Sequence, residues 1–357
     1  ILEYAVSNMA VAVGFSAYLN DFLESMLGFQ LPKQLSAPMI SGGQFTGSWF
    51  NLPALLVLLA LTWILVRGVR ESAETNNVMV LVKVGAILIF VIGAARAIEP
   101  GNWRPFMPNG FQGVMTGAAI VFFTYIGFDS VSTAAEECKR PQRDLPFGII
   151  ATLIVCTLLY AAVALVLTGI ADYKTLANAA PVANALKAIG FENIRRWVSV
   201  GALMGMVSSL LVFQYGQARV WFAMSRDGLL PPAFSRVHPV HQTPYISTWV
   251  AGLAVGLPAG VWDIGTFADL ANIGTLFAFV LVSAGVIVLR RRQPERPRSF
   301  RVPLVPWLPM LSIASCFVLM LSLPLETWVR FFVWLVIGLA VYFVFGKKHS
   351  ELADRTW

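Results

Sequence analysis

The stretch "FFTYIGFDSVSTAAEEC", residues 122–138, interrupts an apolar segment with a glycine and a carboxylate. Gly127 weakens a helix by about 1 kcal/mol relative to alanine. Asp129 can offer a side-chain oxygen to the free N–H groups of a following turn, as an N-cap residue does. The stretch therefore predicts one helix that ends near Tyr125 and a second helix that begins near Ser130.

The composition of the chain indicates whether this break lies in water or in a membrane. Of the 357 residues, 57% are hydrophobic and 13% are charged. Soluble domains are about half apolar and about a quarter charged, so a soluble fold of this length would lack the polar residues to cover its surface. The composition predicts an all-α, polytopic membrane protein.

Long apolar segments recur along the chain. A bilayer core of roughly 30 Å needs about 20 apolar helical residues. We expect about ten transmembrane segments in one domain, 1–357, and a short amphipathic surface helix in "APVANALKAIGF". The expected segments are 1–27, 50–69, 77–97, 113–138, 145–170, 196–224, 245–262, 267–289, 305–323 and 326–345.

The basic residues predict the orientation. The net charge is +7, and most Lys and Arg residues fall in alternate connections, which the positive-inside rule places in the cytoplasm. Both termini of the chain are then cytoplasmic and the protein lies in the cell membrane, most simply a bacterial inner membrane. Nucleic acid is not an expected partner, since no patch of basic and aromatic residues lies outside these connections. One connection, "LRRRQPERPRSFR" at 289–301, could contact anionic lipid, although a solvated loop is the simpler interpretation.

A broken helix at membrane depth is tolerated where the freed backbone groups line a cavity or are buried in protein. Many transporters bind small polar substrates at such a break. The alternative is a kinked, continuous helix in which a neighbouring group satisfies Asp129.

Lys83 is a second polar residue in an apolar run, six residues after Asn77. A lysine near the bilayer centre costs about 2.5 kcal/mol or more. Six helical residues span only about 9 Å, so the side chain could reach the cytoplasmic surface. The other interpretation is an interior amine that loses and regains a proton during turnover. Glu3 is a possible interior ligand, or simply lies near the cytoplasmic end of the first segment.

The sequence offers little for a metal, a cofactor or catalysis. Cys138, Cys156 and Cys316 have no paired spacing, which argues against a disulfide or zinc framework. His238 and His241 lie in a proline-rich connection. The predicted spans contain no histidine cluster, no nucleophile–base pair and no paired carboxylates, so we expect neither an enzyme nor a cofactor.

Four stretches together resemble amino-acid permeases of the APC superfamily, in particular the branch that is similar to cationic amino-acid transporters. The resemblance implies a LeuT-type fold of two inverted repeats, in which this chain corresponds to family helices 3 to 12 and helices 1 and 2 are absent. The stretches are "LEYAVSNMAVAVGFSAY" (2–18), "LVKVGAILIF" (81–90), "FFTYIGFDSVSTAAEECKRPQRDLPFGII" (122–150) and "GQARVWFAMSRDGLLP" (216–231).

The resemblance also implies roles for residues. Carbonyl groups at the break would accept hydrogen bonds from the substrate ammonium, the ring of Phe123 would cover the substrate, and Asp129 would cap the second half-helix. Lys83 would replace the sodium ion of related carriers, with Ser208 or Ser209 near its amine. The implied substrate-binding residues are Phe123, Thr124, Tyr125, Ile126 and Gly127.

The function implied by the resemblance is secondary active amino-acid transport, as proton-coupled symport by alternating access. The implied partners are an amino acid, a proton and the lipid bilayer. Neutral and cationic amino acids remain open as substrates. A non-transporting membrane scaffold or amino-acid sensor that keeps the fold is the alternative.

Overall fold

The computed structural model describes residues 1–68, 73–128, 140–178, 180–298 and 300–350. Within them the chain is almost entirely helical, which confirms the all-α prediction. A single short antiparallel hairpin joins β1 (Ile40–Ser41) to β2 (Gln44–Phe45).

The helices follow one another along the chain with short connections. The α-helices are α1 (Leu2–Leu27), α2 (Lys33–Ser36), α3 (Leu52–Val66), α4 (Ala73–Ala94), α5 (Gly110–Val121), α6 (Pro141–Ile170), α7 (Pro181–Ala188), α8 (Glu192–Arg226), α9 (Tyr245–Val261), α10 (Ile264–Arg292), α11 (Trp307–Leu321), α12 (Leu325–Val341) and α13 (Lys347–His349). A π-helical turn, Tyr342–Gly346, joins α12 to α13. Short 3-10 turns are Ala95–Ala97, Pro100–Trp103, Phe122–Tyr125, Tyr173–Thr175 and Pro232–Ser235.

Each predicted membrane segment contains one of these helices. In the described part of the chain, five stretches are both long and apolar enough to cross a membrane, and four further apolar helices are shorter. The long stretches are Asn77–Ala97, Pro141–Ile170, Glu192–Arg226, Ala271–Arg292 and Leu325–His349; the shorter helices are α3, α5, α9 and α11. The predicted surface helix is α7. Together they form a polytopic membrane protein.

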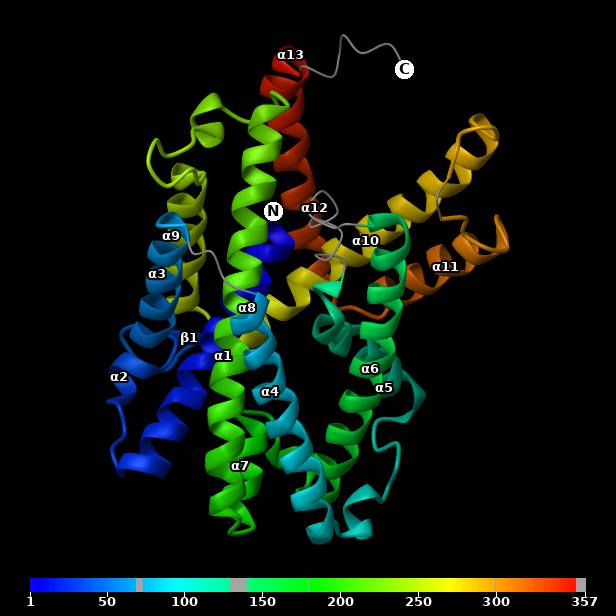
Figure 1. The fold of residues 1–357 in the computed structure, drawn as a ribbon. Coiled ribbons are helices and arrows are strands. Elements are labelled where there is room, and N and C mark those ends of the chain that lie inside the picture. The colour runs from blue at the N-terminus through cyan, green and yellow to red at the C-terminus, as the bar shows by residue number, and fades with distance from the viewer. Residues whose placement is uncertain (69–72, 129–139, 179, 299, 351–357) are drawn as a thin grey trace.

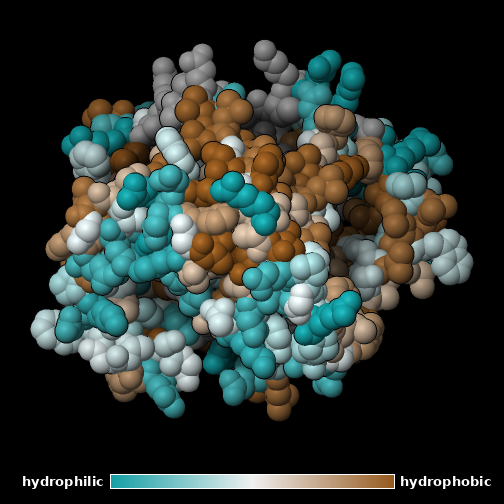
Figure 2. All heavy atoms as spheres, turned by 90° about the horizontal axis from the view of Figure 1, so that it is seen from below, coloured by the Kyte–Doolittle hydropathy of each residue, from teal (hydrophilic) through white to brown (hydrophobic). Residues whose placement is uncertain are grey.

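Helix α1 lies at the centre of the arrangement. It packs along α8 and α10, α3 pairs with α9 beside it, and α4 runs along α8 (Figure 1). The buried face of α1 is rich in small residues such as Ala5, Ala10, Ala12 and Ser16, which permit close approach of neighbouring backbones. The end of the molecule at which α7 lies shows many hydrophilic side chains, as expected for a face that meets water (Figure 2).

Small residues also bring α4 against α8. A methyl group added to Gly201 would lie 2.1 Å from the Cβ of Ala86, and one added to Gly205 would lie 3.4 Å from the Cβ of Lys83. Glycines four residues apart form the small-residue motif that lets membrane helices cross closely. The stem of Lys83 therefore lies directly against α8.

A buried ion pair joins the end of α1 to the start of α8. The Arg195 side chain is 3% exposed and that of Asp21 is 6% exposed. The Nε of Arg195 donates to Oδ1 of Asp21 at 2.8 Å, and the Ser199 hydroxyl donates to the other carboxylate oxygen at 2.6 Å. Arg195 also donates to Glu24 at 3.0 Å and to Glu192 at 3.0 Å. The guanidinium is thus fully satisfied, as a buried charge must be.

The same network reaches α7. The amine of Lys187 donates to Oε1 of Glu24 at 2.7 Å, so α7 is tied to α1 through the carboxylate that also receives Arg195. Ala183 and Leu186 of α7 are fully buried beneath this link. The short surface helix is therefore fixed by packing and by charge.

We expect Arg195→Met to lower the free energy of unfolding by about 3–5 kcal/mol, because it leaves the Asp21 carboxylate buried without its partner. The thermal unfolding midpoint of the purified protein in detergent measures the loss. Arg196→Met is the matched control, since Arg196 is exposed and donates only to the Ser25 carbonyl. Equal midpoints for the two variants would contradict a structural role for the buried pair.

Candidate functional site

The break predicted at 122–138 is present in its first half. Helix α5 ends at Val121 and continues as the 3-10 turn Phe122–Tyr125. Gly127 has φ +113°, a conformation that residues with a side chain rarely adopt. A Cβ at this position would also lie 3.2 Å from the ring of Phe213 on α8. Asp129 and Ser130 lie outside the described residues, so the second half-helix and its cap stay a prediction.

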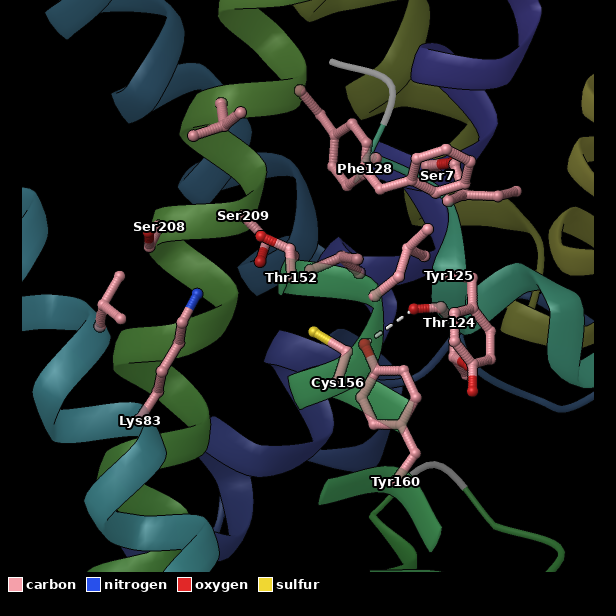
Figure 3. A pocket seen from close by; sticks show the side chains of 17 residues that line it. Ser7, Lys83, Thr124, Tyr125, Phe128, Thr152, Cys156, Tyr160, Ser208 and Ser209 are labelled. Atoms are coloured by element: carbon pink, nitrogen blue, oxygen red, sulfur yellow. Dashed lines mark hydrogen bonds between the residues drawn. The ribbon is translucent and has the colours of Figure 1, made fainter. Parts of the chain in front are cut away.

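Donors from other helices reach the carbonyl groups near this break. Asn272 of α10 donates its amide Nδ2 to the Ile120 carbonyl at 3.0 Å. The Thr124 hydroxyl donates to the Val121 carbonyl at 2.8 Å. The Tyr160 hydroxyl of α6 donates to the Thr124 carbonyl at 2.9 Å, the bond drawn in Figure 3. Backbone groups freed from a membrane helix need such partners.

A cavity of about 420 Å³ lies beside the break, between α1, α4, α6 and α8 (Figure 3). Small-molecule sites commonly have volumes of about 300–1,000 Å³, so a small metabolite fits. The described residues that line it are Ser7, Val11, Val80, Lys83, Thr124, Tyr125, Ile126, Gly127, Phe128, Thr152, Leu153, Cys156, Tyr160, Ser208, Ser209, Val212 and Phe213.

Most of the predicted site residues meet in this cavity. Thr124, Tyr125, Ile126 and Gly127 contribute from the break, and Lys83, Ser208 and Ser209 contribute from α4 and α8. Phe123 belongs to the 3-10 turn; its ring lies outside the described atoms, and its role as a cover stays a prediction. Glu3 lies in the first turn of α1 and is not among the described lining residues, so its role also stays a prediction.

Lys83 is half-buried and directs its amine into the cavity (Figure 3). Within the part of the chain that the structure describes, this amine makes no hydrogen bond or ion pair. The neighbouring Ser209 hydroxyl donates to the Gly205 carbonyl at 3.0 Å, the usual arrangement for serine in a membrane helix. Ser208 is buried and lines the same wall.

A second cavity of about 320 Å³ meets the first at Val11, Lys83 and Ser209. Its wall is mostly apolar, and Val182 of α7 is part of it. Among the described lining residues of both cavities, Lys83 is the one charged side chain. The second cavity is lined by Val11, Tyr18, Lys83, Ala86, Ile87, Phe90, Val163, Val182, Val198, Gly201, Ala202, Gly205, Met206 and Ser209.

Sequence analysis missed two groups that line the first cavity. Thr152, Cys156 and Tyr160 are spaced by four residues, which places them on one face of α6. That spacing of polar residues in an apolar span was a usable signal. Ser7 gave no such signal; it is 1% exposed, and its hydroxyl has no hydrogen-bond partner among the described residues.

Comparisons with known proteins agree with this architecture. A model of the amino acid permease family matches residues 1–342. The chain is 48% identical over 354 residues to the branched-chain amino acid permease BcaP of Bacillus subtilis, covering 99% of this chain and 76% of that protein. It is 46% identical to the methylthioribose transporter of the same organism, with the same coverage. It is 32% identical to cationic amino acid transporter 9 of Arabidopsis thaliana, covering 98% of this chain and 73% of that protein.

We expect Tyr160→Phe to destabilise the protein by about 1–3 kcal/mol, because the Thr124 carbonyl loses its donor in a site with few alternatives. The thermal unfolding midpoint in detergent measures this. Tyr173→Phe, in an exposed 3-10 turn, serves as the control. An unchanged midpoint for Tyr160→Phe would show that the bond does not hold the break.

Proposed function

This chain belongs to the amino acid permease family and is a membrane transporter of amino acids; on that premise we propose that it carries a neutral amino acid together with a proton, by alternating access. One observation carries the proposal: Lys83 and the residues of the break from Thr124 to Gly127 line the same cavity. An amino acid bound there would lie beside a group able to gain and lose a proton.

The substrate ammonium is assigned to the Thr124 carbonyl. In the structure this carbonyl accepts from the Tyr160 hydroxyl, and an ammonium is a stronger donor because it is charged. The C-terminal end of α5 also carries partial negative charge, which favours a cation at the break. Substrate binding would then exchange the Tyr160 hydroxyl for the ammonium.

Lys83 is assigned to proton coupling. A charged amine without a carboxylate in its described surroundings is costly in a membrane interior, which makes Lys83 the candidate for the group that carries the proton. If the environment of Lys83 differs between the outward-open and inward-open states, protonation of Lys83 stabilises one state over the other. Proton movement then biases the equilibrium between the two states. Arg219, by contrast, lies over the ring of Tyr215 at 4.0 Å near the end of α8.

The side chain of the substrate is assigned to the second, apolar cavity. Its described lining holds no carboxylate to pair with a cationic side chain, and Lys83 would repel one. An uncharged, apolar side chain would instead contact Ile87, Phe90 and Val163. This supports the substrate class named for BcaP over the one named for the Arabidopsis transporter.

We expect Lys83→Ala to abolish proton-driven accumulation in proteoliposomes while exchange of substrate for substrate continues, because exchange needs no net proton movement. Lys174→Ala, in an exposed connection, should retain both activities. Accumulation of substrate by Lys83→Ala against its gradient, driven by protons alone, would refute the coupling role.

We expect unlabelled leucine to compete for uptake of labelled leucine at least about tenfold more effectively than arginine, which corresponds to about 1.4 kcal/mol. The physical reason is the apolar wall and the cationic Lys83. Half-maximal inhibitory concentrations measured in the same vesicles test this, with alanine as a small neutral comparison. Equal competition by arginine would contradict a neutral substrate.

A further inference from the structure

The connection between α10 and α11 is folded by its own arginines. Arg298 donates to the carbonyls of Leu289 at 3.2 Å, Pro294 at 2.8 Å and Arg296 at 2.9 Å, closing the end of α10. Arg290 donates to the Val302 carbonyl at 3.1 Å. These bonds give the described part of the connection a defined shape, while most of its described residues stay exposed.

This connection and the start of α6 enclose a groove of about 400 Å³. Leu145, Pro146, Ile149 and Ile150 form one wall, and Phe300 closes the other. Phe300 is 50% exposed and Ile150 is 53% exposed, so the apolar surface is open to the surroundings. An apolar surface of this kind matches the acyl chain of a lipid.

Two exposed arginines are close in the sequence to the residues that line the groove. Arg143 lies on α6 between lining residues, and Arg301 directly follows Phe300. Neither guanidinium makes a hydrogen bond or ion pair with the residues that the structure describes. Arg140 pairs with Asp144 at 3.6 Å, and both are exposed. The start of α6 and the connection between α10 and α11 thus each carry more arginines than carboxylates.

An exposed apolar stripe continues from the groove along α6. Phe147 is 75% exposed, Ile154 57%, Leu158 67% and Leu165 56%. Their spacing places them near one side of the helix. Arg143 lies toward the N-terminal end of α6, at the same end of the helix at which this stripe begins.

We propose that this groove binds an anionic phospholipid, with the phosphate on Arg143 and Arg301 and an acyl chain between Ile149, Ile150 and Phe300. A soluble phosphate would use only the arginines, and a zwitterionic lipid would gain less from them. The groove lies on the side of the basic connections, which we predict to be cytoplasmic, where anionic lipids are abundant. The proposal is independent of the transported substrate.

Photo-crosslinking tests the proposal on the purified protein in detergent. The probe is phosphatidylglycerol with a diazirine in one acyl chain, and the label is mapped by peptide mass spectrometry. We expect labelling of the peptides that contain Ile149 and Phe300, about tenfold above that by phosphatidylcholine with the same chains. Equal labelling by the two lipids would overturn the proposal.

Two double variants distinguish binding of phosphatidylglycerol in this groove from a general attraction of anionic lipid to basic surfaces of the protein. Arg143→Gln with Arg301→Gln should reduce labelling by phosphatidylglycerol to the level of phosphatidylcholine. The matched control is Arg226→Gln with Arg236→Gln, in another basic connection, which should leave labelling unchanged. Similar losses in both double variants, or full displacement by millimolar glycerol phosphate, would overturn the proposal. Unfolding midpoints check that each variant is folded.

Discussion

The interior of a bilayer contains no water, so each backbone group that a broken helix frees needs a partner from the protein itself. At the end of α5 the partners of the described carbonyls come from different parts of the chain. Asn272 on α10 holds the Ile120 carbonyl, and Tyr160 on α6 holds the Thr124 carbonyl. The break at Gly127 is therefore also the point at which three helices are tied together beside the cavity.

Two cations, Arg195 on α8 and Lys83 on α4 beside it, have very different surroundings. Arg195 is surrounded by three carboxylates and a serine hydroxyl network, with no cavity in its described contacts. Lys83 has two cavities beside it and no carboxylate among its described neighbours. The first arrangement holds a charge permanently, since losing either partner leaves the other unpaired. The second leaves the amine beside whatever enters the cavities, as the proposed coupling role requires.

Patterns that are local in the sequence predicted much of the fold and of the candidate site. Each expected membrane segment contains a helix, the α5 end lies near Tyr125, and Lys83, Ser208 and Ser209 do line the cavity with the break. Local patterns could not predict the contact between Asp21 and Arg195, because these two residues are 174 positions apart in the sequence. They also could not show that Ser7 faces the cavity, because a serine in a membrane helix normally satisfies itself on its own backbone. Asp129, prominent in the sequence, lies outside the described residues.

Helix α6 connects the cavity to the lipid. One face carries Thr152, Cys156 and Tyr160 into the site, while another presents Phe147 and Leu158 to the surroundings. The proposed alternating access requires elements that move against a fixed framework. A shift of α6 would break the bond between the Tyr160 hydroxyl and the Thr124 carbonyl, so the state of the break is joined to the position of this helix.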